Sequence, residues 1–148
     1  MGLKKISCLT SVEVKTKLRI DLADFAGHSK FACYDYFHVG TASSNYKLTI
    51  AGYQHWGVGV AGDSMTGSHS LNGMQFSTHD RDNDESSGNC AASNRGGWWY
   101  NNCHHSNLNG LYLDGQSNTA GVTWLNFNAT STSWNTLRYS DMKLRRSG

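Results

Sequence analysis

A chain of 148 residues with 16% charged residues and a formal net charge of +2 is long enough for one domain with its own core. The small charge and the short basic clusters exclude an extended surface for nucleic acid or for an acidic membrane. No stretch approaches the roughly 20 apolar residues that a membrane span needs, so membrane insertion is not expected.

The first half of the chain alternates polar and apolar residues, which predicts β-strands. The expected strands are residues 17–22, 31–39 and 46–50. Turns are expected at Gly27-His28 and across residues 40–45, so that the strands form two antiparallel hairpins. Helical periodicity is weak, and the sequence favours at most a short helix near 41–45 or 104–110.

The pattern changes from Gly57 onward, where glycine recurs at short intervals. This composition predicts short strands joined by long loops. Long loops in a compact domain are usually functional or held together by crosslinks or ions. A boundary between two parts of the domain is expected near residues 56–73.

An acidic run, DRDNDE, begins at residue 80. Asp80, Asp82 and Asp84 have the spacing that opens an EF-hand loop. An EF-hand then needs Gly and Glu where this chain has Glu85 and Ala91, so this type of site is excluded. Two interpretations stay open for the run itself, a looser oxygen cage for Ca²⁺ and a solvated acidic turn.

The four cysteines comprise one close pair and two isolated residues. Cys90 and Cys103 enclose twelve residues, and a disulfide between them would stabilise the fold by roughly 3 kcal/mol. A zinc site that adds His104 and His105 to these cysteines is the weaker alternative, because no CxxC motif is present and adjacent His residues rarely both reach one zinc. Cys8 and Cys33 flank the first expected strand and either pair with each other or stay as thiols.

Paired tryptophans follow paired glycines at Trp98 and Trp99. The favoured interpretation is that both side chains anchor the core, and the alternative is that one of them stacks on a sugar.

Catalytic motifs are missing from the sequence. The chain has no GxSxG, HExxH or SxxK motif. Asp80 and Asp82 are two carboxylates, as in a glycosidase active site. They lie on a polar loop, however, which offers no apolar pocket to raise the pKa of one of them so that it could act as the general acid. An enzyme is therefore not expected.

Ten stretches of the chain resemble the fibrinogen C-terminal domain family, among them NGMQFST, DRDND, GWWY and SDMK. They are residues 18–22, 24–25, 61–64, 72–78, 80–84, 89–91, 97–100, 103–104, 107–110 and 140–143. The resemblance covers residues 1 to about 146. It implies an α+β fold with an antiparallel sheet subdomain (about 1–72) and a loop-rich, calcium-binding subdomain (about 73–148).

Family domains are longer and begin with a smaller subdomain that has its own disulfide. The resemblance therefore implies that this chain is an N-terminally truncated domain. The first 18 residues have neither the apolar run nor the cleavage site of a signal peptide. A truncated domain would explain why a protein of a secreted family lacks this signal here.

The resemblance assigns the calcium ligands residue by residue. It implies that the carboxylates of Asp82 and Asp84 and the backbone carbonyls of Ser86 and Gly88 bind Ca²⁺, while Asp80 supports the loop. The same resemblance pairs Cys90 with Cys103 in a disulfide.

The ligand pocket follows from the same resemblance. A cis peptide bond is implied at Asn102–Cys103, and in lectin members the amides beyond it bind an acetyl carbonyl. The corresponding residues are Cys103 and His104.

The alignment departs from the family at the walls of this pocket. It places Asn94, Asn118 and Thr130 where lectin members have Tyr, which predicts a pocket without an aromatic funnel. It places Asn94 and Thr119 where fibrin-type members have carboxylates for a peptide's positive end.

The expected function is calcium-dependent recognition of glycans or acetyl groups by a secreted, ficolin- or tachylectin-like lectin of innate immunity. The alternative is an extracellular protein-interaction module without lectin activity. Asn128 begins an N-glycosylation sequon, which fits an extracellular protein. The parent protein is expected to be oligomeric, since weak single sites need multivalency.

Overall fold

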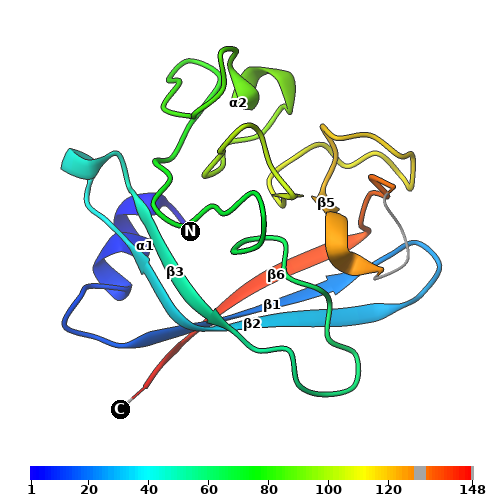
Figure 1. Cartoon of the computed structure of the whole chain (residues 1–148), viewed down its shortest axis with the longest axis horizontal. Coiled ribbons are helices and arrows are strands. Elements are labelled where there is room, and N and C mark those ends of the chain that lie inside the picture. Colours follow the sequence, from blue (N-terminus) through cyan, green and yellow to red (C-terminus); the bar gives the residue numbers. More distant parts are fainter. Residues whose placement is uncertain (129–132, 148) are drawn as a thin grey trace.

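A four-stranded antiparallel sheet forms one half of the computed structural model, which describes residues 1–128 and 133–147 (Figure 1). The strand order is β3-β2-β1-β6. The strands are β1 (Thr16–Ala23), β2 (Ser29–Val39), β3 (Leu48–Tyr53) and β6 (Tyr139–Arg146). The three strands and two hairpins predicted in the first half are confirmed, with bounds that differ by three residues or fewer.

The last strand of the sheet comes from the far end of the chain. β6 runs antiparallel to β1, from the pair Thr16↔Arg146 to the pair Ala23↔Tyr139. The alternation analysis predicted no strand there, and the division at about residue 72 placed this segment with the second half. Its side chains are mostly half-buried or exposed, so β6 lacks the clear two-sided pattern that reveals a strand.

One face of the sheet carries the core. Leu18, Ile20 and Leu22 of β1 are buried on this face, as are Ala32 and Tyr34 of β2. These alternate positions follow from the period of two along a strand. The second half of the chain lies over this face and completes the core (Figure 1).

Helix α1 (Leu3–Leu9) was not predicted from the sequence. Thr10, which ends it, ties it to the sheet, because its Oγ1 accepts a hydrogen bond from the Val39 N–H (3.0 Å). Of the two positions considered for a short helix, the first is confirmed by η1 (Ala42–Ser44). The second is wrong, because residues 104–110 contain β4 (Ser106–Asn107).

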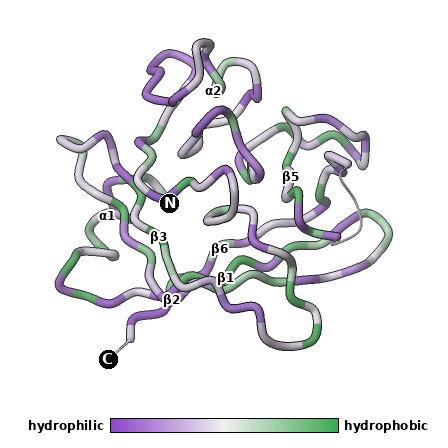
Figure 2. The backbone as a smooth tube through the Cα atoms, viewed as in Figure 1, coloured by the Kyte–Doolittle hydropathy of each residue, from purple (hydrophilic) through white to green (hydrophobic). Residues whose placement is uncertain are grey.

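Short elements and loops make up the chain between β3 and β6, as predicted. They are α2 (Cys90–Ser93), β5 (Thr123–Trp124), which pairs with β4, and η2 (Leu125–Phe127). Figure 2 shows that hydrophilic segments recur through the loops around α2. The α+β class is confirmed.

Trp98 and Trp99 hold these loops on the sheet. Their exposed fractions are 1% and 3%, so the core-anchor interpretation is confirmed and sugar stacking by either ring is wrong. Trp99 also donates its Nε1–H to the Tyr46 carbonyl (2.8 Å). Within the described residues, no helix has the length and apolarity to cross a bilayer.

Candidate functional site

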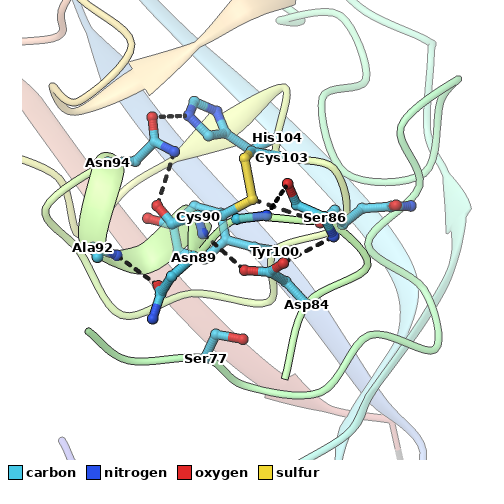
Figure 3. Close-up of a disulfide and its surroundings, with 12 residues drawn as sticks. Ser77, Asp84, Ser86, Asn89, Cys90, Ala92, Asn94, Tyr100, Cys103 and His104 are labelled. Carbon is cyan, nitrogen blue, oxygen red and sulfur yellow. Dashed lines mark hydrogen bonds between the residues drawn. A yellow bond between two sulfur atoms is a disulfide. The ribbon is translucent and has the colours of Figure 1, made fainter. Parts of the chain in front are cut away.

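Residues 82–88, which we call the acidic coil, form successive turns in which a side-chain oxygen accepts a hydrogen bond from the backbone N–H two residues on; Figure 3 shows Asp84 and Ser86 of this segment. The Asp84 N–H donates to Asp82 Oδ1 (3.2 Å), and the Ser86 N–H donates to Asp84 Oδ1 (2.9 Å). The Gly88 N–H then donates to Ser86 Oγ (3.2 Å). Asp and Ser side chains favour such turns because they bond the backbone two residues on. The coil therefore follows from the alternate spacing of these residues.

The oxygen atoms of this coil fit a hard cation. Burial raises the pKa of the Asp84 carboxyl above its ordinary value, and the neighbouring Asp82 carboxylate adds to the rise. Among the described hydrogen bonds, none ends on the carbonyl oxygen of Ser86 or Gly88. Carboxylates and backbone carbonyls are the ligands that Ca²⁺ prefers. The chemistry of the donor set therefore matches calcium.

The described ranges, 1–128 and 133–147, contain no group of three His, Cys, Asp or Glu side chains placed to hold a metal. A cation in this loop would thus depend on two carboxylates and on backbone carbonyls. Asp80 has a different role, since its Oδ1 accepts from Thr78 Oγ1 (2.7 Å) in an exposed turn.

Asn83 fixes the coil to the core and was missed by the sequence reasoning. Its Nδ2 donates to the Phe76 carbonyl (2.8 Å), and its N–H donates to Ser77 Oγ (3.0 Å). Its place between two acidic residues was the only signal, and an Asn in a polar loop is too common to single out.

The disulfide joins the acidic coil to the segment that follows the tryptophans. Cys90 and Cys103 are bonded with a Cα–Cα distance of 5.6 Å, which confirms the pairing and removes both thiolates from the zinc alternative. The Cys90 N–H donates to Asp84 Oδ2 (2.9 Å). The Glu85 N–H donates to the Asn101 carbonyl (3.2 Å). The Asn102–Cys103 peptide bond is cis, as predicted.

A pocket of about 430 Å³ opens beside this disulfide. Its lining residues are His69, Asn94, Asn102, Cys103, His104, His105, Thr119 and Trp134. Four of the five proposed ligand residues line it, namely Asn94, Cys103, His104 and Thr119. Asn118 does not line it, and instead donates its N–H to the Trp134 carbonyl (3.1 Å).

His104 lies deep in the pocket with an exposed fraction of 6%. Asn94 Nδ2 donates to the Cys90 carbonyl (2.9 Å), so Asn94 Oδ1 faces His104 Nε2 (3.1 Å; Figure 3). This arrangement assigns the proton of the neutral ring to Nε2. Burial lowers the pKa of His104 to about 4, and the nearby His105 adds to the effect. The ring is therefore neutral at physiological pH.

Two polar features of the pocket lack partners. His104 Nδ1 is buried without a hydrogen bond of normal geometry among the described residues, although the Thr119 backbone lies close enough to the ring to influence its pKa. In the same part of the structure, no backbone hydrogen bond uses the N–H of Cys103 or of His104. Unpaired donors and acceptors in a pocket are the groups that a ligand would satisfy.

Aromatic side chains form one wall, which corrects the expectation of a pocket without them. The Trp134 ring contacts the His104 ring with 5.1 Å between centroids, and His69 and His105 stack at 4.3 Å. Sequence reasoning missed His69 and Trp134, because they lie on loops far from His104 in the chain, and it considered His105 only as a zinc ligand. Thr130, which was aligned to a family Tyr, lies outside the described residues, and Trp134 follows it by four positions.

Asn107 lies behind the pocket wall, where it bonds the backbone of Asn94, and it was also missed. Its Oδ1 accepts from the Tyr100 hydroxyl (2.6 Å), and its Nδ2 donates to the Asn94 carbonyl (3.0 Å). Both groups are buried, so the amide satisfies polar atoms that would otherwise be unpaired.

The other proposed positions lie away from the pocket. Asn128 Oδ1 accepts from Lys30 Nζ (3.1 Å), and the Thr of its sequon lies outside the described residues. Cys8 and Cys33 are free thiols, so the alternative in which they pair is wrong.

Comparison with known families supports the resemblance found in the sequence. Residues 1–147 match the family model for the C-terminal globular domain of fibrinogen beta and gamma chains. Fibrinogen C domain-containing protein 1 of Homo sapiens is 45% identical over 153 aligned residues, covering 98% of this chain and 31% of the relative. Ryncolin-4 of Cerberus rynchops is 44% identical, covering 98% and 40%. The chain thus spans less than half the length of these relatives.

Solved structures with similar folds include the fibrinogen-like globe domain of human ANGPTL6. Its TM-score is 0.86 at 38% identity, and the match covers 99% of this chain and 63% of that one. Lamprey fibrin D-dimer, solved with the peptide Gly-His-Arg-Pro-amide, gives a TM-score of 0.81 at 32% identity, covering 97% and 48%.

Proposed function

Because this chain belongs to the fibrinogen C-terminal globular domain family, we propose that it is an extracellular binding module that recognises acetylated glycans in a calcium-braced pocket. The single observation that carries the proposal is the pair of unpartnered N–H groups at Cys103 and His104, which border the 430 Å³ pocket. Two adjacent donors of this kind suit a carbonyl oxygen, such as that of an N-acetyl group.

The wall of the pocket suits the methyl of the same group. Trp134 and His104 present ring surface beside the proposed donors, and an apolar methyl gains free energy from such contact. The neutral His104 ring carries no charge to repel an uncharged ligand. The lining therefore favours a small, neutral group with one polar and one apolar end.

Calcium has a supporting role in this proposal. Held by Asp82 and Asp84 with the Ser86 and Gly88 carbonyls, it would neutralise two adjacent carboxylates and so stabilise the coil. The coil bonds Cys90 through Asp84, and Cys90 is joined to Cys103 in the pocket. Removal of calcium is thus expected to loosen the pocket without removing any ligand contact.

Binding to a glycan array, with calcium and with a chelator, tests the proposal. We expect binding to N-acetylated sugars that the chelator abolishes. Trp134→Ala should weaken it by at least about tenfold, through the loss of buried aromatic contact. Tyr112→Ala, which removes an exposed ring outside the pocket, is the matched control and should bind normally. Silence on every acetylated sugar by a folded, calcium-bound protein would contradict the proposal.

Recognition of an extracellular protein is the second candidate. The structural neighbour solved with a peptide shows that a similar fold accepts one. Asn94 and Thr119 line the pocket here without a carboxylate, so a positively charged peptide end would find no partner charge. Binding to acidic or neutral peptides, in the absence of sugar binding, would favour this candidate.

A further inference from the structure

Arg95 follows α2 in a backbone conformation that is unusual for an arginine. Asn94 is the C-cap of α2, so Arg95 is the first residue beyond the helix, and its φ is 56°. Glycine is the usual residue at this left-handed position, because a Cβ atom is strained there. Strained residues cluster at functional sites. Glycine would relax this turn, so the conformation points to a use for the Arg95 side chain.

A pocket of about 520 Å³ lies beside Arg95 and is separate from the candidate ligand pocket. Its lining comes from residues between 78 and 97, in the loops around α2, and shares no residue with the pocket of about 430 Å³. Arg95 and His79 are its titratable side chains, and no carboxylate lines it. The Asp80 carboxylate lies 3.9 Å from His79 Nδ1 but is not part of the lining. Among the described residues, the Arg95 guanidinium has no hydrogen bond or ion pair, so its charge is not neutralised.

The backbone carbonyl groups on either side of Arg95 face the protein interior. The Asn94 carbonyl accepts from Asn107 Nδ2 (3.0 Å), and the Gly96 carbonyl accepts from the Tyr100 hydroxyl (3.0 Å). Asn107 and Tyr100 are both buried. The peptide bonds that contain these two carbonyls are trans. Because the N–H of a trans peptide points opposite to its C=O, the N–H groups of both peptides point away from the interior.

These N–H groups belong to Arg95 and Gly97, and both residues line the pocket of about 520 Å³. Neither N–H donates a hydrogen bond within the described part of the chain. A residue near the right-handed region followed by a left-handed one, as in Asn94 (φ −98°, ψ 9°) and Arg95, forms a concave row of N–H groups that binds anions. The pocket thus combines backbone donors with a free guanidinium.

We propose that this pocket is a second binding site of the domain, which takes the oxyanion of an acidic ligand, either a sulfate ester or a carboxylate. The Arg95 guanidinium would form a forked, charge-assisted pair with two oxygen atoms of the anion, for which its planar shape is suited. The N–H groups of Arg95 and Gly97 would donate to the same anion. This site differs from the acetyl pocket in its charge and its lining, so it does not depend on the function proposed above.

Titration with sodium sulfate and, separately, with sodium acetate tests the site, with sodium chloride holding the ionic strength constant. In NMR spectra of the backbone amides, the signals of Arg95 and Gly97 should shift and then saturate. Saturation by sulfate alone would identify a sulfate ester as the natural group, and saturation by acetate alone would identify a carboxylate. Acetate also resembles an acetyl group, so the His104 amide signal is followed as a separate reporter of the other pocket.

A matched pair of variants tests the role of the guanidinium. Arg95→Asn removes it and inserts a residue that tolerates the left-handed conformation, so the variant should bind the anion about tenfold more weakly. Its Tm should not fall, because the strain at this position is relieved. Arg81→Asn removes an exposed arginine that does not line the pocket, and it should bind like the wild type.

Three results would each overturn the proposal. The first is that neither anion shifts the Arg95 and Gly97 amide signals. The second is that Arg95→Asn binds the anion as tightly as the wild type does. The third is that Arg81→Asn weakens binding as much as Arg95→Asn, since the anion would then respond only to the overall charge of the protein.

Discussion

Asn94 Oδ1 lies 3.1 Å from His104 Nε2, and the same amide donates through Nδ2 to the Cys90 carbonyl at 2.9 Å. One buried side chain therefore joins the pocket histidine to the disulfide. Because Asn has a fixed donor and a fixed acceptor, it settles both the orientation and the tautomer of His104.

Asn94→Ala should destabilise the fold. It leaves His104 Nε2 without its partner in a buried place, at a cost of about 1–3 kcal/mol in the free energy of unfolding, while the Cys90 carbonyl keeps only the hydrogen bond from the residue 94 backbone N–H (2.8 Å). Urea unfolding measures the change. Asn109→Ala, which removes an exposed hydrogen bond to the Gly97 carbonyl, is the control and should cost less than about 0.5 kcal/mol. Equal effects of the two changes would refute the bridging role of Asn94.

Stability should fall as the solution is acidified through the range of His104. Its pKa is lowered from an ordinary value of 6.5 to about 4, chiefly by burial. Between these two values the unfolded chain binds the proton and the folded chain does not. The stabilisation is thus complete above pH 6.5 and is lost progressively as the pH falls toward 4.

Urea unfolding across this pH range, beside an NMR titration of the His104 ring, measures the effect. A His104→Phe variant keeps a ring in the pocket and removes the titration, so its stability should vary less over the same range. A His104 ring that titrates near 6.5 in the folded protein would contradict the prediction.

The acidic coil offers a sharp test of the calcium ligands. Asp84→Asn removes one proposed ligand charge and should weaken calcium binding by tenfold or more, as measured by calorimetry. Asp80→Asn alters the same acidic run but only an exposed turn, so it should bind calcium almost normally. If both variants titrate like the wild type, the ion is not held by this coil.

The sheet was predictable where its pattern is local. Strands β1 and β2 alternate clearly, because Leu18, Ile20 and Tyr34 face a covered core while their neighbours face solvent. β6 was not, since its partner β1 lies more than a hundred residues away and both its faces are partly exposed. α1 was also not predicted, because its N-cap is Gly2, which has no side chain to form the capping hydrogen bond that marks the start of many helices.

The candidate site was also predictable only in part. The spacing of the acidic residues left a calcium cage and a solvated turn open, and only the family resemblance assigned the oxygen ligands of the coil and the pocket positions of Cys103 and His104. His69 and Trp134 could not be found, because only the folded chain brings their loops together. Asn94 was identified as a wall residue, but its bridge to His104 depends on an orientation that no sequence displays.

The construction of the pocket has a consequence for how such a domain can diversify. Its frame is fixed by the Cys90–Cys103 disulfide and by the buried hydrogen bond from Asn107 to Asn94, whereas Trp134 and His69 come from separate loops. Mutations in those loops can change what is recognised while the inherited frame keeps its stability. New specificities can therefore evolve in this domain by small steps, each of which leaves a folded protein.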